Sequence, residues 1–196
     1  MIKEKLKQGT LLYYVYLYYH LFFRYKLFYK KKNYSQFGED LFLVDFYKDK
    51  PIGKFVDLGC FHPIRDNNTY QLYRKGWRGI NVDMNSLSID FFNYFRPEDI
   101  NLNIGLAKNK SEKKLYFSGE FSPLNTIDVN HLKFLKKNFN LEKEKIKQRK
   151  IKTQTINNVL KKYKYNKIDF LTIDLEGYEY EVLSNLNFNK YKINII

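Results

Sequence analysis

From Gly53 onward, short apolar runs alternate with stretches of helical periodicity, and this alternation constrains the fold more than any other feature of the sequence. The run 168–173 is apolar almost throughout, which is typical of a central parallel strand covered on both faces. The alternation predicts an α/β fold with a mostly parallel sheet and right-handed crossovers. Core strands are expected at residues 54–58, 79–83, 100–107, 168–173 and 193–196.

The segments between these runs favour helices, and residues 114–118 favour an added hairpin or edge strand. Gly76 is suited to a left-handed helix end. Ser86 and Thr155 are expected to cap the helices that follow them. The expected helices are 68–75, 86–95, 130–150, 155–163 and 178–186.

The composition, with 44% hydrophobic and 29% charged residues, allows a core and excludes a disordered chain. The single cysteine, Cys60, excludes a disulfide framework and a cysteine-rich zinc module, and it favours a reducing, cytoplasmic location. We predict one domain over residues 34–196, preceded by an aromatic and basic helical segment over residues 1–33.

The net charge of +14 is concentrated in two segments. Residues 1–32 contain eight Lys or Arg and one Glu, and residues 131–167 contain thirteen Lys or Arg and two Glu. Such charge suggests an acidic partner, although solvated lysine-rich faces explain it equally well. No module with basic residues interleaved among exposed aromatics is recognisable, so nucleic acid is not the expected partner.

Residues 11–23 form an aromatic run that is shorter than the roughly 20 residues of a membrane span. No small-residue cleavage site follows, so a signal peptide is not expected. Tyrosines favour the membrane–water boundary and flanking lysines favour anionic headgroups. Peripheral membrane association through residues 11–32 is therefore one hypothesis, and a helix packed on the domain or a poorly ordered extension is the other.

Acidic side chains lie at the carboxyl ends of three expected strands, where α/β sheets bind their ligands. Asp57 comes just before Gly59 at the first end, Asp83 closes the second strand, and Asp174 and Glu176 follow the fourth. Asp83 comes 26 residues after Asp57, a spacing compatible with an acid that binds the ribose of an adenosine-type ligand. A glycine after Asp57 allows a tight turn and a close approach to a ligand.

The loop after the first strand lacks the Gly-x-Gly-x-x-Gly pattern, and Pro63 removes a backbone N–H that a pyrophosphate would need. Asp57 would also repel a phosphate. These features favour S-adenosylmethionine, which carries cationic ammonium and sulfonium groups, over a dinucleotide. The protein would then hold an acceptor in line with the methyl group and accept its proton.

Four motifs, in this order, resemble the FkbM-type class I methyltransferases: YSQFGED at 34–40, FVDLGCFHP at 55–63, NTY through GWRGI at 68–80, and DFLTIDLEGYE at 169–179. The resemblance implies a Rossmann-like sheet, S-adenosylmethionine as cofactor, and O-methylation of a hydroxyl, often on a sugar, glycan or small molecule.

The resemblance also implies roles for individual residues. Asp57 and Gly59 match the methionine end of the cofactor site, Asp83 matches the ribose-binding acid, and Asp174 and Glu176 match the acids at the reaction end. Cys60 and Met84 adjoin these positions and complete the cofactor-binding candidates, although Cys60 also suits simple packing. At the reaction end, Asp174 and Glu176 are candidates for a general base, for acceptors of a hydrogen bond from the substrate hydroxyl, or for metal ligands. A cation would need further oxygen ligands, and the sequence shows no such set.

The sequence departs from the family pattern in two places. Met84 and Asn85 follow the ribose acid where a proline is often found. Class I sheets usually have seven strands, and the sequence ends in the fifth, so a C-terminally incomplete domain is expected. A truncated, non-catalytic remnant that binds a cofactor or a partner is therefore the main alternative, and an RNA-directed methyltransferase is a third.

Other residues near these motifs are weaker candidates. His62 is a possible proton acceptor in the cofactor loop, or an incidental loop residue. Two interpretations remain open for Gln36 and Glu39: they close over the cofactor, or they only cap the first helix. Glu179 is expected to face the N-terminal dipole of its helix. Trp77 and the phenylalanines of 91–95 are interpreted as packing residues.

Overall fold

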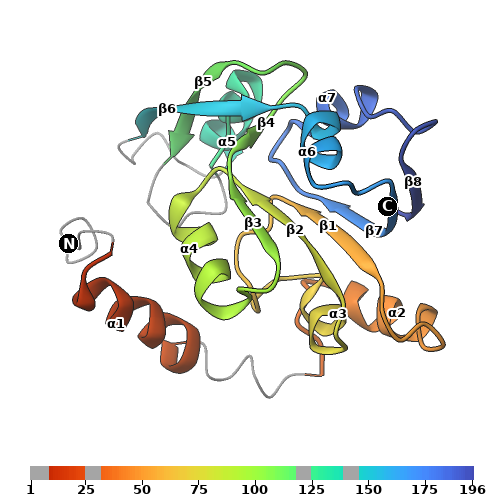
Figure 1. Ribbon diagram of the computed structural model, residues 1–196. Coiled ribbons are helices and arrows are strands. Elements are labelled where there is room, and N and C mark those ends of the chain that lie inside the picture. Colours follow the sequence, from red (N-terminus) through yellow and green to blue (C-terminus); the bar gives the residue numbers. More distant parts are fainter. Residues whose placement is uncertain (1–8, 25–31, 118–124, 139–145) are drawn as a thin grey trace.

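The computed structural model describes residues 9–24, 32–117, 125–138 and 146–196. Its centre is a five-stranded sheet in the order β3-β2-β1-β7-β8, in which every pair of neighbours is parallel (Figure 1). The mixed α/β architecture and the parallel sheet confirm the predicted fold class. The strands are β1 (Lys54–Leu58), β2 (Arg78–Asp83), β3 (Ile100–Asn103), β7 (Lys167–Ile173) and β8 (Lys192–Ile195).

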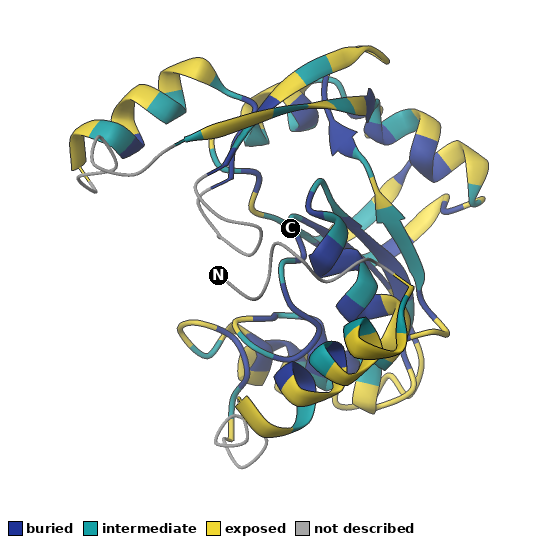
Figure 2. Cartoon of the chain, turned by 90° about the vertical axis from the view of Figure 1, so that its left-hand side faces the viewer, coloured by how far each residue is buried: buried dark blue, intermediate teal, exposed yellow. Residues whose placement is uncertain are grey.

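Side chains of the strands point alternately to two apolar layers. Val56 and Leu58 of β1 pack in one layer with α6 (Ile156–Lys162) and α7 (Glu179–Ser184). Phe55 packs in the other with Leu43 of α2 (Glu39–Phe46) and Leu72 of α3 (Tyr70–Arg74). Figure 2 shows buried residues along the strands and exposed ones on the outer faces of the helices.

A smaller three-stranded sheet, in the order β4-β6-β5, lies beside the central one. It consists of β4 (Gly105–Leu106), β5 (Glu112–Phe117) and β6 (Lys147–Gln154). The added strand expected at 114–118 is β5, apart from residue 118, which lies outside the described residues. Two expectations were wrong here. The run 100–107 divides between the two sheets, and residues 147–150 belong to a strand because they pair antiparallel with β5.

The rest of the segment expected to be helical at 130–150 contains α5 (Val129–Asn138), and residues 139–145 lie outside the described part of the chain. The cap of α4 (Ser86–Phe95) is Asn85 and not Ser86, because the Asn85 side chain accepts a hydrogen bond from Leu87 N. The Thr155 cap is confirmed, since its hydroxyl accepts from Asn158 N. Gly76 adopts the expected left-handed conformation, with φ of 93°.

The chain begins in the described region with α1 (Leu11–Tyr19), which continues as a π-helix, η2 (His20–Arg24). Leu17 and Leu21 pack against Leu87 and Phe91 of α4. Within the described residues, no helix has both the length and the apolar character that a bilayer span requires.

Candidate functional site

A cavity of about 350 Å³ lies at the carboxyl ends of the central strands. A volume of this size suits a small organic ligand, and the position is where open α/β sheets bind one. The lining residues come from the segment before α2, from the loops after β1, β2, β3 and β7, from α4 and from residues before α5. They include Gln36, Gly59, Asp83, Met84, Ser88, Asn125, Asp174 and Glu176.

The floor of the cavity forms where the chain leaves β1 and β7. Asp174 N donates to Leu58 O at 2.8 Å, and Gly59 N donates to Val82 O at 2.8 Å. Gly59 has φ of 84°, and a β-carbon there would lie 1.8 Å from the carbonyl oxygen of Asp174. Only glycine fits between the ends of these strands. The missing side chain allows a close approach to the backbone that follows the neighbouring strand β7, and not only to a ligand in the cavity.

Asp83 is half-buried on the cavity wall, at the end of β2. Its Oδ2 accepts from Phe61 N at 2.9 Å and its Oδ1 accepts from Asn85 N at 2.7 Å. Burial raises the pKa of Asp83 to about 6, although both backbone bonds oppose the rise. Each oxygen retains a second lone pair, so the fixed carboxylate can still accept hydrogen bonds from a ligand's hydroxyls.

A tight turn after β7 carries Asp174 and Glu176 into the same cavity. Glu176 has a left-handed backbone with φ of 51°. Glu179 holds the turn, because its carboxylate accepts from Leu175 N at 2.7 Å and from Gly177 N at 3.1 Å. Glu179 therefore binds backbone N–H groups of the turn just before α7.

His131 of α5 is a residue of the site that the sequence did not reveal. Its Nε2 lies 2.9 Å from Glu176 Oε2, and a β-carbon at Gly177 would lie 2.8 Å from the His131 β-carbon. Burial raises the pKa of Glu176 most, the neighbouring Asp174 adds to the rise, and the hydrogen bond from His131 opposes it. Burial and Glu179 likewise raise the pKa of Asp174. The arrangement is a carboxylate–imidazole pair at the cavity edge.

Asp57 and Cys60 do not line the cavity. Asp57 Oδ2 accepts from Asn67 Nδ2 and from Thr69 Oγ1, each at 3.0 Å. Burial raises the pKa of Asp57 to about 6, against the attraction of Arg96. Cys60 is buried with Ile89 and Phe92. Asp57 is thus a hydrogen-bonded interior carboxylate and Cys60 is a packing residue, as the sequence also allowed, and their roles in cofactor binding stay predictions.

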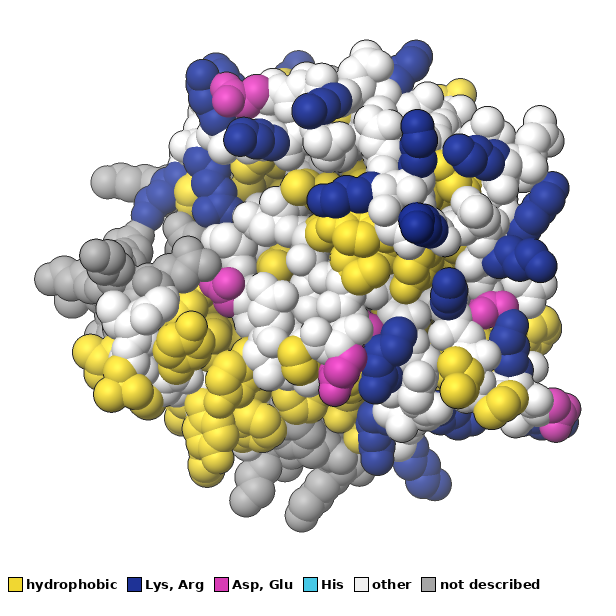
Figure 3. Space-filling view, viewed as in Figure 1, with side chains coloured by type: hydrophobic (Ala, Val, Ile, Leu, Met, Phe, Trp, Pro, Cys, Tyr) yellow, Lys and Arg dark blue, Asp and Glu magenta, His cyan; other side chains and the backbone are white. Residues whose placement is uncertain are grey.

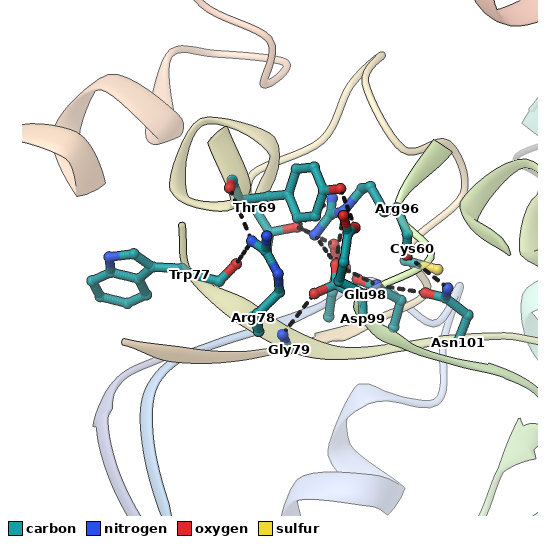
Figure 4. Close-up of polar contacts among 12 residues, drawn as sticks. Cys60, Thr69, Trp77, Arg78, Gly79, Arg96, Glu98, Asp99 and Asn101 are labelled. Atoms are coloured by element: carbon teal, nitrogen blue, oxygen red, sulfur yellow. Dashed lines mark hydrogen bonds and ion pairs between the residues drawn. The ribbon is translucent and has the colours of Figure 1, made fainter. Parts of the chain in front are cut away.

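Arg96 is the centre of the buried network to which Asp57 belongs (Figure 4). Arg96 Nη2 lies 2.8 Å from Asp99 Oδ2, and both side chains are fully buried. Arg96 Nη1 donates to Thr69 Oγ1 at 3.1 Å, and the Thr69 hydroxyl donates onward to Asp57. Asp99 also accepts from Gly79 N of β2 at 2.9 Å. The network fixes the loop after β1 to β2, beside the cavity.

The remaining candidates lie in three places: on the cavity wall, at the exposed start of α2 and in the interior. Gln36 and Met84 line the cavity. Glu39 begins α2 and accepts from Phe37 N at 2.9 Å, a contact within the turn that precedes the helix. His62 is buried outside the lining residues, its Nδ1 accepts from Ile64 N and Arg65 N, and burial lowers its pKa to about 3, so it is a structural residue. Trp77 is fully buried, as expected for packing.

Two polar atoms of residues in the cavity wall have no protein partner within the described residues. They are Ser88 Oγ, on α4, and Asn125 Oδ1. Both atoms have almost no accessible surface, so they lie behind the cavity wall and do not face the cavity directly. The Asp83 carboxylate, which does line the cavity, fits the hydroxyls of a ribose.

Comparison with protein families agrees with this geometry. The sequence model described as the methyltransferase FkbM domain matches residues 53–196. Neither a search of curated proteins nor a search of solved structures found a significant match. The family match covers the five strands of the central sheet and nearly all of the cavity wall. The chain belongs to the FkbM methyltransferase family.

Proposed function

We propose that this protein transfers a methyl group from S-adenosylmethionine to a hydroxyl oxygen of a sugar, glycan or other small molecule. The observation that carries the proposal is the shared cavity: Asp83, at the end of β2, and Asp174 and Glu176, after β7, line the same 350 Å³ space. Family membership supports the reaction type. The acceptor class follows from the resemblance to FkbM-type enzymes, and the carboxylates in the lining are suited to hold a hydroxyl.

The residues present fit the cofactor. Asp83 would accept hydrogen bonds from the two ribose hydroxyls. Gly59 lines the cavity without a side chain. When bound, S-adenosylmethionine supplies an electrophilic methyl group on a sulfonium. Acidic side chains at the cavity are suited to a cationic ligand and unsuited to a pyrophosphate.

Residues of the chain accept the proton that leaves the acceptor hydroxyl. Glu176 is the proposed proton acceptor, because it lines the cavity and its raised pKa brings its basicity closer to neutral pH. His131 orients the Glu176 carboxylate through the 2.9 Å hydrogen bond. Asp174 would accept a hydrogen bond from the same or a second acceptor hydroxyl and so hold it in line.

Calorimetric titration of the full chain with S-adenosylhomocysteine tests the cofactor site. We expect binding, weakened about tenfold to a hundredfold by Asp83→Asn, since a hydrogen bond to a charged group contributes roughly 1.5–3 kcal/mol. Asp45→Asn, on the exposed face of α2, is the matched control and should bind normally. No heat from the intact chain contradicts the proposal.

Activity requires a second measurement, because binding alone is also the behaviour of a non-catalytic remnant. Transfer of labelled methyl groups to a panel of glycans and small alcohols, lost in Glu176→Gln, supports the enzyme. Binding without transfer to any acceptor supports the remnant. Transfer to RNA only would support the RNA-directed alternative, which the cavity lining does not favour, because Asp66, Asp83, Asp174 and Glu176 outnumber the single cation, Arg65.

A further inference from the structure

Helix α1 has no polar face. Its sequence, Leu-Leu-Tyr-Tyr-Val-Tyr-Leu-Tyr-Tyr, contains no charged side chain. A helix that is apolar on all sides normally lies in an interior. Here hydrophobic side chains gather on the surface over α1, at the lower left of Figure 3. We call this surface the outer face of α1; it continues onto the first turn of η2. Its side chains, each between 46% and 80% exposed, are Leu11, Leu12, Tyr14, Val15, Tyr18, Tyr19 and Phe23.

The inner face of α1 is held firmly on the domain. Leu17 and Leu21 are buried against Leu87 and Phe91 of α4. The Tyr13 hydroxyl also donates to the Asp90 carboxylate of α4. These contacts fix the rotation of the helix, so the outer face is presented in one direction as a contiguous surface.

A contiguous apolar surface on a folded protein marks a contact site. The charge around the helix indicates what it contacts: residues 1–32 contain eight Lys or Arg against one Glu, and all of them lie before or after the uncharged stretch 8–23. Basic flanks attract anionic headgroups, and tyrosine rings favour the boundary between headgroups and acyl chains. We propose that the outer face of α1 docks on an anionic membrane leaflet, with the helix lying in the plane of the interface.

The contact has a consequence for the cavity, since both share α4. Leu87 and Phe91 of this helix pack on α1, whereas Ser88 lines the cavity. Docking therefore leaves both α1 and α4 between the bilayer surface and this wall of the cavity. The docking surface itself is independent of which reaction, if any, the cavity supports.

Flotation of the full chain with lipid vesicles tests the proposal. We expect the protein to float with vesicles that contain phosphatidylglycerol, to float much less with pure phosphatidylcholine, and to be released by high salt, which screens the headgroup attraction. The double variant Leu12→Glu/Val15→Glu should reduce partitioning by about tenfold or more, because carboxylates are costly in the apolar layer.

A matched control distinguishes an effect specific to this surface from a general effect of added negative charge. The double variant Ile52→Glu/Tyr180→Glu adds the same two charges at side chains that are 70% and 83% exposed and lie outside α1. We expect it to float like the wild type. Equal loss in both variants, or full binding by Leu12→Glu/Val15→Glu with its circular dichroism unchanged, overturns the proposal. So does a lipid-free dimer in sedimentation analysis that only the α1 variant dissociates, since the face would then bind a second copy.

Discussion

The carbonyl oxygen of Asp174 lies 1.8 Å from the point that a β-carbon would occupy at Gly59. The two residues sit at the ends of neighbouring parallel strands, and the missing side chain lets the cavity floor close. Gly59 therefore contributes to both the fold and the site, because the close packing of the two strand ends also places Asp174 at the cavity.

The first prediction concerns Gly59→Ala, which should lower the free energy of unfolding by about 3 kcal/mol or more. The left-handed backbone alone costs roughly 1–2 kcal/mol for alanine, and the overlap with backbone adds a packing penalty of similar size. Gly76→Ala is the control, because Gly76 has φ of 93° but nothing within 4 Å of its β-carbon position. Urea denaturation should show a loss of only about 1–2 kcal/mol for Gly76→Ala, and equal losses would contradict the steric argument.

The second prediction concerns the buried pair of Arg96 and Asp99. Arg96→Met leaves the Asp99 carboxylate buried without its cation, so we expect a loss of about 3–5 kcal/mol in the free energy of unfolding. Arg65→Met removes the partly exposed partner of Asp66 and should cost about 1 kcal/mol or less. Thermal and urea unfolding measure both. A small effect at Arg96 would mean that the network does not hold the loop after β1.

The third prediction is a pH dependence that arises from Asp57. Its pKa is about 6 in the folded protein and about 3.9 in an unfolded chain, so the folded state binds more protons between these values. Stability should therefore fall as the pH rises through this window, by up to about 3 kcal/mol from this group. Asp57→Asn removes the charge, while its amide oxygen can keep both bonds that Asp57 Oδ2 accepts.

The measurement is urea unfolding of both proteins at a series of pH values from about 4 to 7. We expect the stability of Asp57→Asn, relative to the wild type, to increase steadily across the series. Asp83 titrates in the same range and is present in both proteins, so the difference between them reports Asp57 together with its electrostatic interaction with Asp83. A difference that does not change with pH would show that Asp57 stays ionised throughout.

The central sheet could be predicted from the sequence because its strands are apolar runs with helices between them. The bounds of β1 were predicted to the residue, and those of β2 and β7 within one residue. The run 100–107 was misjudged because pairing, and not composition, decides which sheet a strand joins: Gly105 and Leu106 pair with Thr153 and Gln154. A local sequence pattern does not reveal which distant segment a strand will pair with.

The first half of strand β6, residues 147–150, was mistaken for the end of a helix because half of the residues in the strand are Lys or Arg. A signal was present: Arg149, Ile151 and Thr153 alternate with more exposed residues, which is the period of a strand. The acids of the site were found because strand ends are predictable. His131 was missed because its partner, Glu176, is 45 residues away and belongs to a different element.

The fourth prediction concerns the pair of Glu176 and His131. If Glu176 accepts the acceptor's proton, Glu176→Gln should lower kcat by about 10²–10⁴-fold with little change in the affinity for S-adenosylhomocysteine. His131→Asn should retain activity, but it removes the hydrogen bond that opposes the raised pKa of Glu176. The acid limb of the kcat profile should therefore move to higher pH, since more Glu176 is protonated at any given pH. His20→Asn, in the buried contact of η2 with Phe91, is the control for loss of an imidazole elsewhere and should leave the limb in place. A limb that does not move in His131→Asn would mean that another group accepts the proton.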